Sequence, residues 1–383
     1  MITELESAHL ERLEKFRGFV NEEIAPFADG FDKEERTPPS ILEKLGRQGY
    51  LGATIPVEYG GLGLDMVTYG LLCHEMGRAS ASLLSLLTVH GMVSHVLAKW
   101  GTEEQRKRWL PRLAKGTTLG AFALTEPTIG SDARNIVSRA ERAEGGYDLN
   151  GTKKWISYGQ TAGLFIVFAQ VESKPTAFLV ERETKGLSVL PIGGMLGFRA
   201  SMLAEIRFKD CRIPMDAAMG RVGMGVSHVG GYALDFGRYS IAWGATGLGQ
   251  ACLDACLEYS GNRSQGGSLL RDHQFIQGMI AEMIVNVKAA KLLCVRAGRL
   301  KDSGDPESII ETTIAKYFAA RMIGRVANDA VQIHGANGCG EDFPIQRFFR
   351  DARIMEIIEG STQIQQTVIC GSRNDKSYRD DFF

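Results

Sequence analysis

The sequence predicts an α+β chain of several domains: an N-terminal α-helical domain, a middle antiparallel β-barrel and a C-terminal four-helix bundle. Apolar residues recur at helical spacing up to about residue 118, and their period changes to two between about 119 and 214. Long amphipathic helical patterns then return and form a bundle. Because strands and helices do not alternate along the chain, this order argues against a Rossmann fold or a TIM barrel. We expect domain boundaries at 1–118, 119–220 and 221–383.

The first expected domain, 1–118, is helical. Pro38-Pro39 opens a helix that runs to Gln48, and the apolar run 66–100 contains no proline. The glycine-rich stretch 60–63 is expected to be a loop between helices. It is not a dinucleotide-binding fingerprint, because no strand leads into it and the spacing of its glycines differs.

The second expected domain, 119–220, consists of short strands. Runs of apolar residues at 164–168, 177–180, 187–190 and 204–208 have the spacing of a barrel or sandwich. The pair Asn150-Gly151 predicts a hairpin turn. Trp155 and Ser157 follow it two positions apart, so an extended strand would turn both side chains to one face.

The third expected domain, 221–383, contains long helices over 238–259, 272–301 and 306–335. The glycine-rich stretch 244–249 lies within a helical pattern, where small residues favour close helix packing over nucleotide binding. The polar segment after residue 372 is expected to be a flexible tail.

The composition excludes some classes of protein. The 383 residues are 44% hydrophobic and carry a formal net charge of −1, as in a soluble globular protein. No basic run interleaved with aromatic residues indicates a nucleic-acid partner. The N-terminus is charged and no apolar run approaches the length of a membrane span, so we expect a cytoplasmic protein. Seven scattered cysteines predict reduced, mostly buried thiols, and nothing predicts a metal site.

Glu359 is the candidate catalytic base. It follows the apolar residues Met355, Ile357 and Ile358 and precedes a polar Gly-Ser-Thr-Gln turn. Desolvation by these neighbours would raise its pKa, as removal of a weakly acidic C–H proton near neutral pH requires. The local pattern fits an acidic helix end with a glycine cap equally well.

Four segments together resemble the acyl-CoA dehydrogenase flavoprotein family, in the same order and over nearly the whole chain. They are FALTEPTIGSD (122–132), NGTKKWIS (150–157), QIHGANG (332–338) and EGSTQ (359–363). The resemblance implies FAD, an acyl thioester substrate, electron-transfer flavoprotein or another acceptor, and a homodimer or homotetramer. It also implies that Glu359 removes the α proton while a hydride leaves the β carbon for flavin N5. The Glu359 backbone N–H and the flavin ribityl 2′-hydroxyl would polarise the thioester carbonyl.

The resemblance also implies which residues contact the flavin half of FAD. These are Phe122, Leu124, Thr125, Trp155, Ser157, Ser361 and Gln363, with Ser131 at the pyrophosphate. Their types agree with what an isoalloxazine ring needs, an apolar or aromatic wall with a few fixed polar groups. Ordinary core packing is the alternative for Trp155.

In the family the adenine half of FAD lies across a subunit interface. The matching positions here are Arg263, Gln274, Gln332 and Gly335. A guanidinium fork suits pyrophosphate oxygens. The chain departs from the family at Gly266-Gly267, which replaces an aromatic–glycine pair and removes a stacking surface.

A narrower resemblance is to dehydrogenases of acyl groups on an acyl carrier protein, in the biosynthesis of hydroxymalonyl and methoxymalonyl extender units for polyketides. It is carried by segments 85–92, 236–244 and 354–361. It implies that Arg238 contacts the substrate arm, with a structural ion pair as the alternative. His90 would face the acyl pocket, although a lone helical histidine is more often structural.

Three competing interpretations stay open from the sequence. They are a catabolic short- or medium-chain acyl-CoA dehydrogenase, a flavin oxidase or monooxygenase on the same scaffold, and a non-catalytic helical binding protein.

Overall fold

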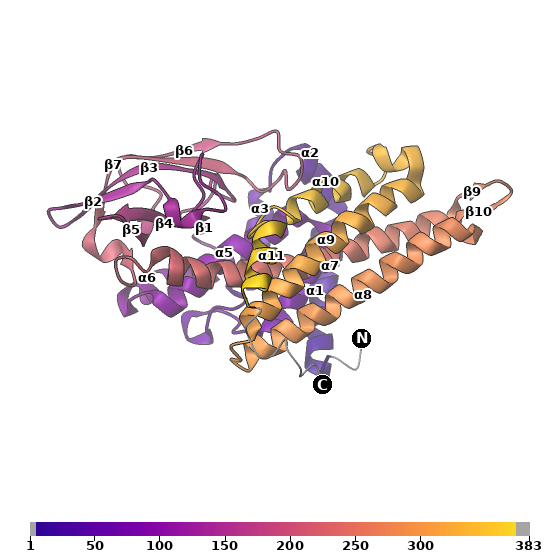
Figure 1. Cartoon of the computed structure of the whole chain (residues 1–383), viewed down its shortest axis with the longest axis horizontal. Helices are drawn as coiled ribbons and strands as arrows, with labels where there is room; N and C mark the ends of the chain where they lie inside the picture. Colours follow the sequence, from indigo (N-terminus) through magenta and orange to yellow (C-terminus); the bar gives the residue numbers. More distant parts are fainter. Residues whose placement is uncertain (1–4, 373–383) are drawn as a thin grey trace.

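The computed structural model describes residues 5–372, in which helices come first, then a sheet, then helices again (Figure 1). This order confirms the predicted fold class. The predicted polar tail lies outside the described residues.

The N-terminal helices include a long apolar helix, α5, which packs mainly against α7 (Gly231–Asn262) and β1 (Gly120–Ala123). They are α1 (Ser7–Glu23), α2 (Ala28–Lys33), α3 (Pro39–Arg47), α4 (Met66–Ala79), α5 (Ala81–Trp100) and α6 (Glu103–Ala114). The apolar run 66–100 divides at Ser80, whose backbone is extended and whose side chain accepts a hydrogen bond from Leu83 N–H to cap α5. By length and composition α5 could cross a membrane, contrary to the expectation from sequence, but 89% of its apolar window is buried inside the protein.

The middle of the chain forms an eight-stranded sheet of order β6-β7-β3-β2-β4-β5-β8, with β1 added beside β4. The strands are β1 (Gly120–Ala123), β2 (Arg139–Ala143), β3 (Gly146–Ile156), β4 (Leu164–Val171), β5 (Lys174–Glu181), β6 (Leu187–Pro191), β7 (Ala204–Pro214) and β8 (Ala218–Met219). Most pairs are antiparallel, but β1 runs parallel to β4. Alternate residues of β4 belong to two cores: Ile166 faces the helices, and Phe165 faces the interior of the β region.

The predicted hairpin turn at Asn150-Gly151 is wrong. Both residues lie inside β3, and the chain turns between β2 and β3 at 144–145. Gly151 lies at a register shift against β7, with φ of 147°, and a Cβ there would be 2.3 Å from Ser138 Oγ. The glycine is therefore needed for a bulge and a close approach to a neighbouring segment.

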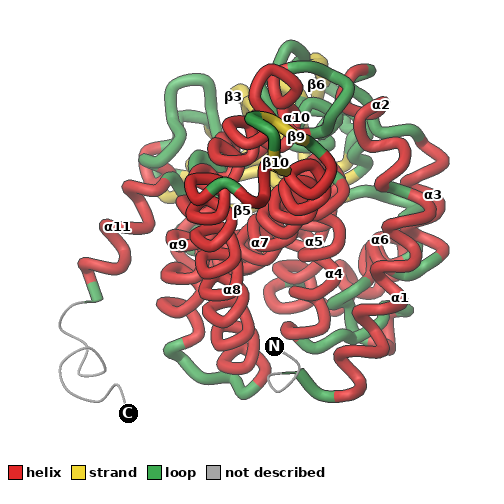
Figure 2. Tube along the Cα trace, turned by 90° about the vertical axis from the view of Figure 1, so that its right-hand side faces the viewer, coloured by secondary structure: helices red, strands yellow, loops and turns green. Residues whose placement is uncertain are grey.

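The C-terminal helices are α7 (Gly231–Asn262), α8 (Gln274–Asp302), α9 (Ser308–His334), α10 (Ile345–Met355) and α11 (Thr362–Gly371), with a small hairpin of β9 (Ser264–Gln265) and β10 (Ser268–Leu269) between α7 and α8. Helix α7 lies between α4 and α5 on one side and α8 and α9 on the other (Figure 2). Its glycines allow this packing, because a Cβ at Gly247 would be 1.9 Å from the His74 carbonyl oxygen. The structure thus agrees with the packing role predicted for 244–249.

Candidate active site

Glu359 lies in the turn between α10 and α11, where two consecutive residues have left-handed backbones. The φ angles are 53° for Glu359 and 87° for Gly360. A glutamate in this conformation is strained, so the surrounding structure must hold it. Gln365 Nε2 donates to the carbonyl oxygens of both residues at 3.0 Å. Lys316 Nζ donates to the Gly360 carbonyl oxygen at 2.7 Å.

The carboxylate of Glu359 packs against α7. Its Oε2 atom is buried and has no hydrogen-bond partner among residues 5–372. A Cβ at Gly237 would be 2.2 Å from this oxygen and 3.0 Å from Met92 Sδ on α5. Burial raises the pKa of Glu359 to about 7, although Arg238 and Lys316 act to lower it. The carboxyl group is therefore suited to accept a proton near neutral pH, in the direction that the sequence predicts.

The backbone N–H of Glu359 also has no partner in the described part of the chain. One residue therefore presents an unpaired acceptor and an unpaired donor. A substrate with an acidic C–H next to a carbonyl would use both, one for the proton and one for the carbonyl oxygen.

Arg238 lies beside this turn, as expected. Its Nε would be 3.7 Å from a Cβ at Gly360, and it is buried without a hydrogen-bond partner in the described chain. Burial lowers the pKa of Arg238, and the charges of Asp235 and Glu359 oppose that effect. The Arg238 guanidinium forms no ion pair within residues 5–372. The described structure therefore does not support the alternative role of Arg238, a structural ion pair.

His90 has a structural role, which corrects the expectation that it faces the acyl pocket. Its Nε2 lies 3.2 Å from the Leu113 carbonyl oxygen, and its Nδ1 accepts from Gly120 N–H at 3.1 Å. Burial lowers the pKa of His90 to about 4, so the ring is neutral. With both nitrogens in contact with backbone groups, the side chain joins α5 to the end of α6 and the start of β1.

The residues of the first two motifs that are expected to contact the flavin lie at the edge of the β region next to α5. Phe122 is in β1, and the centroid of its ring is 5.0 Å from that of Phe168. The Thr125 carbonyl oxygen accepts a hydrogen bond from Lys154 N–H at 2.9 Å. Helix α5 contacts β1 and lies near the Glu359 carboxylate. Its Val93 packs against Gly120 at the start of β1, and the adjacent Met92 lies at the Glu359 carboxylate.

Trp155 is a surface residue. It is 46% exposed, which contradicts ordinary core packing and suits an aromatic wall for a ligand. The prediction that Trp155 and Ser157 lie on one face of an extended strand is wrong. Trp155 has φ of 63°, and β3 ends at Ile156, so the alternation of the strand stops there.

Sequence reasoning missed a buried ion pair beneath this wall. Lys153 Nζ lies 2.7 Å from Glu126 Oε1, both side chains are fully buried, and Lys153 also donates to the Leu124 carbonyl oxygen at 3.1 Å. Burial lowers the pKa of Lys153 to about 8. The pair ties the segment after β1 to β3. Its only signal in the sequence is a lysine and a glutamate within the two motifs.

The residues expected at the adenine half of FAD lie elsewhere. Arg263, Gln274, Gln332 and Gly335 are all exposed at the end of the bundle where α7 ends, α8 begins and α9 ends. This end carries the β9–β10 hairpin and is opposite the β region (Figure 1). A single chain therefore does not bring all the expected FAD residues together.

The remaining expected FAD residues lie in turns or at helix starts. Ser131 is exposed before β2, and Gln363 is exposed in the first turn of α11. Ser361 caps α11, because its Oγ accepts from Ile364 N–H at 3.3 Å. Gly266 and Gly267, at φ of 61° and 86°, form the two-residue turn of the β9–β10 hairpin. This turn favours glycine at both positions.

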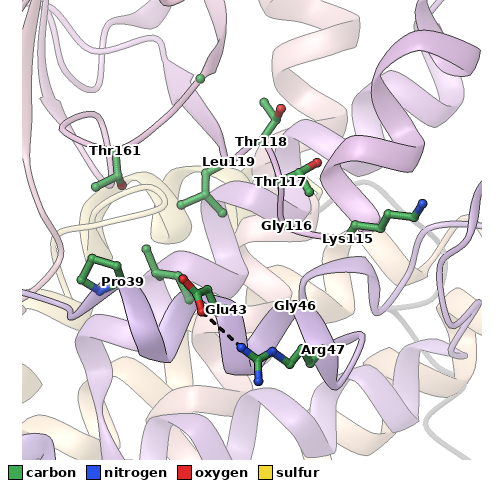
Figure 3. A pocket seen from close by; sticks show the side chains of 12 residues that line it. Pro39, Glu43, Gly46, Arg47, Lys115, Gly116, Thr117, Thr118, Leu119 and Thr161 are labelled. Atoms are coloured by element: carbon green, nitrogen blue, oxygen red, sulfur yellow. Dashed lines mark hydrogen bonds and ion pairs between the residues drawn. The ribbon is translucent and has the colours of Figure 1, made fainter.

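A separate cavity of about 660 Å³ lies between α3, the α6–β1 connection and the approach to β4 (Figure 3). Thr117, Thr118 and Thr161 line it, and Arg47 pairs with Glu43 at its edge, at 3.2 Å. None of the expected site residues lines this cavity. We therefore assign no part of the reaction to it.

Three family models match the chain in succession. They are the acyl-CoA dehydrogenase N-terminal domain over residues 6–117, the middle domain over 121–211 and the C-terminal domain over 223–372. The chain belongs to the acyl-CoA dehydrogenase family. This acyl-CoA dehydrogenase is an FAD-dependent oxidoreductase of acyl thioesters, as the sequence predicts.

Three relatives indicate the range of the similarity. The human mitochondrial short-chain specific acyl-CoA dehydrogenase is 38% identical over 96% of this chain and 90% of its own length. A structure of glutaryl-CoA dehydrogenase from Mycobacterium smegmatis with FADH2 is 28% identical, with a TM-score of 0.93, covering 98% of this chain and 97% of that one. The structure of FkbI, described as serving biosynthesis of a methoxymalonyl extender unit, is 28% identical, with a TM-score of 0.86. The match covers 94% of this chain and 99% of FkbI.

Replacing Gly237 with alanine is expected to reduce substrate-dependent flavin reduction by about 100-fold, because the new methyl group would displace the Glu359 carboxylate. Stopped-flow measurement at saturating substrate would test this. Gly30→Ala is the matched control, since a Cβ at that exposed position in α2 meets nothing within 4 Å. Equal rates for the Gly237 variant and the control would contradict the packing of the base on α7.

Proposed function

We propose that this acyl-CoA dehydrogenase oxidises the Cα–Cβ bond of a short-chain acyl-CoA. The observation that carries the proposal is Glu359, with a buried, unpaired Oε2, a pKa of about 7 and an unpaired backbone N–H. The similarity to the human short-chain enzyme over nearly the whole chain supports a small acyl group on CoA. The expected assignment to carrier-protein substrates has weaker support, from the lower identity to FkbI.

The residues of this chain divide the work of the reaction. Glu359 Oε2 accepts the α proton, and its own N–H donates to the thioester carbonyl oxygen, which makes that proton more acidic. Arg238 adds a positive charge beside the base. When bound, FAD supplies the two-electron acceptor that the oxidation requires.

The residues fit FAD only if two chains share it. We propose that Phe122, Leu124, Thr125, Trp155 and Ser157 of one chain hold the flavin, with Ser131, Ser361 and Gln363 as further contacts of the cofactor. Arg263, Gln274, Gln332 and Gly335 of a second chain would hold the adenine half. Exposed apolar side chains on α8 support association, with Phe275 88% and Val285 64% exposed. A homodimer or homotetramer would satisfy this arrangement.

Reduced flavin must be reoxidised before the next turnover. We propose electron-transfer flavoprotein as the acceptor and the cytoplasm as the compartment. Rapid peroxide formation in air on substrate addition would instead favour an oxidase.

The test is anaerobic bleaching of the flavin by one small acyl group loaded on CoA or on an acyl carrier protein. We expect faster bleaching by the CoA thioester. The rate should rise with pH to a midpoint near 7, because Glu359 must be ionised to act as a base. Bleaching only by the carrier-bound form would support extender-unit biosynthesis, and bleaching by neither form over a series of acyl groups would contradict the proposed reaction.

A further inference from the structure

We infer that Lys316 and Gln365 are positioning residues. Together they hold the Glu359–Gly360 turn in its left-handed conformation, and Lys316 places a buried ammonium group against this turn. The inference rests on the proposed function, in which Glu359 is the base.

The Gly360 carbonyl is fixed from two directions. Lys316 comes from the middle of α9 and Gln365 from the first turn of α11, and both side chains are fully buried. A carbonyl oxygen has two lone pairs, and here each donor can use one, at 2.7 and 3.0 Å. Gln365 also donates to the Glu359 carbonyl, at 3.0 Å. The backbone on both sides of the Glu359–Gly360 peptide is thereby restrained.

The same restraint directs the two groups of Glu359 that would meet a thioester. The carboxylate must reach the space above Gly237, and the backbone N–H must stay free of the turn. A peptide that relaxed toward negative φ would rotate both groups together. Loss of the hydrogen bonds from Lys316 and Gln365 should therefore displace the carboxylate and the backbone N–H of Glu359 at the same time.

A fully buried lysine needs a compensating charge. Among residues 5–372, Lys316 forms no ion pair within 4.0 Å, and its one hydrogen bond goes to a neutral carbonyl. Burial lowers the pKa of Lys316 to about 8, while the charges of Glu359 and Glu356 raise it. The Glu359 carboxylate is therefore part of what keeps Lys316 charged, and the reverse also holds.

The charged groups that act on Glu359 come from two helices, with Arg238 from α7 and Lys316 from α9. Asp235 of α7 acts on Arg238, and Glu356, which follows α10, acts on Lys316. Gln365 of α11 and Met92 of α5 are neutral. Removing Lys316 removes one of two cations that lower the Glu359 pKa, so that pKa should rise.

The test compares Lys316→Met and Gln365→Met with Lys291→Met in the holoenzyme. Lys291 is a matched control on α8, because burial also lowers its pKa to about 8 and its Nζ donates to Gln250 Oε1 at 2.6 Å. We expect Lys316→Met to move the midpoint of the pH profile for flavin reduction upward by about one pH unit. Gln365→Met should lower the plateau rate by about 10-fold without that upward movement. Lys291→Met should change neither quantity.

Infrared titration of the Glu359 carboxyl group in holoenzyme without substrate gives a second readout, with its band assigned by loss in Glu359→Gln. A raised midpoint in Lys316→Met, together with no flavin bleaching of the wild type by any acyl thioester, would support this inference and reject the proposed function. Active wild type with an unchanged midpoint in Lys316→Met would overturn the inference alone. If Lys316→Met fails to fold, Lys316→Arg should keep the midpoint of the pH profile for flavin reduction and lower its plateau rate. A lowered midpoint or an unaltered plateau rate in Lys316→Arg would overturn the inference.

Discussion

Glu359→Gln is expected to lower the rate of substrate-dependent flavin reduction by about 10³-fold while FAD stays bound. Glutamine keeps the size of the side chain above Gly237 but cannot accept the α proton. The backbone N–H that would bind the carbonyl is retained, so the loss should appear in the rate of reduction more than in substrate affinity. Single-turnover kinetics, with the visible spectrum recorded for bound flavin, would measure both.

Glu356→Gln is the control for this variant. Glu356 lies three residues earlier, and its carboxylate contacts Arg353 at 3.1 Å and Thr362 at 3.2 Å. We expect it to keep a rate within a few-fold of the wild type. Full turnover by Glu359→Gln with FAD bound would remove Glu359 from the reaction and leave the scaffold to another function.

Lys153→Met is expected to lower the free energy of unfolding by about 3–5 kcal/mol, because it leaves the Glu126 carboxylate buried without its cation. Two backbone donors, Val137 N–H at 2.6 Å and Ser138 N–H at 2.9 Å, would still bind that carboxylate. The variant should also release FAD more readily, since Lys153 fixes the Leu124 carbonyl. Urea unfolding and flavin retention on gel filtration would measure the two effects.

An ion pair on the surface of the same sheet provides the comparison. Arg142 and Glu172 are 2.9 Å apart and both are largely exposed, so Arg142→Met should change the unfolding midpoint very little. Adding Glu126→Gln to Lys153→Met should recover part of the lost stability. An unfolding midpoint for Lys153→Met that matches Arg142→Met would show that the buried pair does not stabilise the β region.

The pattern of apolar residues predicts well those elements whose structure is determined by the local sequence. The long helices of the bundle have a clear helical period, the strand 204–208 alternates apolar and polar residues, and 164–168 is a continuous apolar run. All of these elements were expected. The hairpin turn predicted at Asn150-Gly151 is wrong because a contact with a residue distant in sequence determines the structure there. Ser138, from the segment just before β2, requires the glycine there, and the local sequence does not reveal that contact.

The candidate site was predictable to a similar degree. Burial of Glu359 follows from its apolar neighbours, so the direction of its pKa could be predicted. Its positive φ, the contact with Gly237 and the donors Lys316 and Gln365 come from segments distant in sequence. Lys153 was missed because a lysine within a strand is usually expected to face solvent.

The turn that holds Glu359 also limits what can be borrowed from this enzyme by protein design. Grafting the EGSTQ pentapeptide onto another helix junction would transfer the base without the two donors that orient it. A useful transplant would need at least a lysine from a crossing helix, a glutamine one turn into the following helix and a glycine on the facing helix. The smallest portable unit is therefore the α10–α11 junction together with the parts of α7 and α9 that contact it, and a five-residue motif is too small.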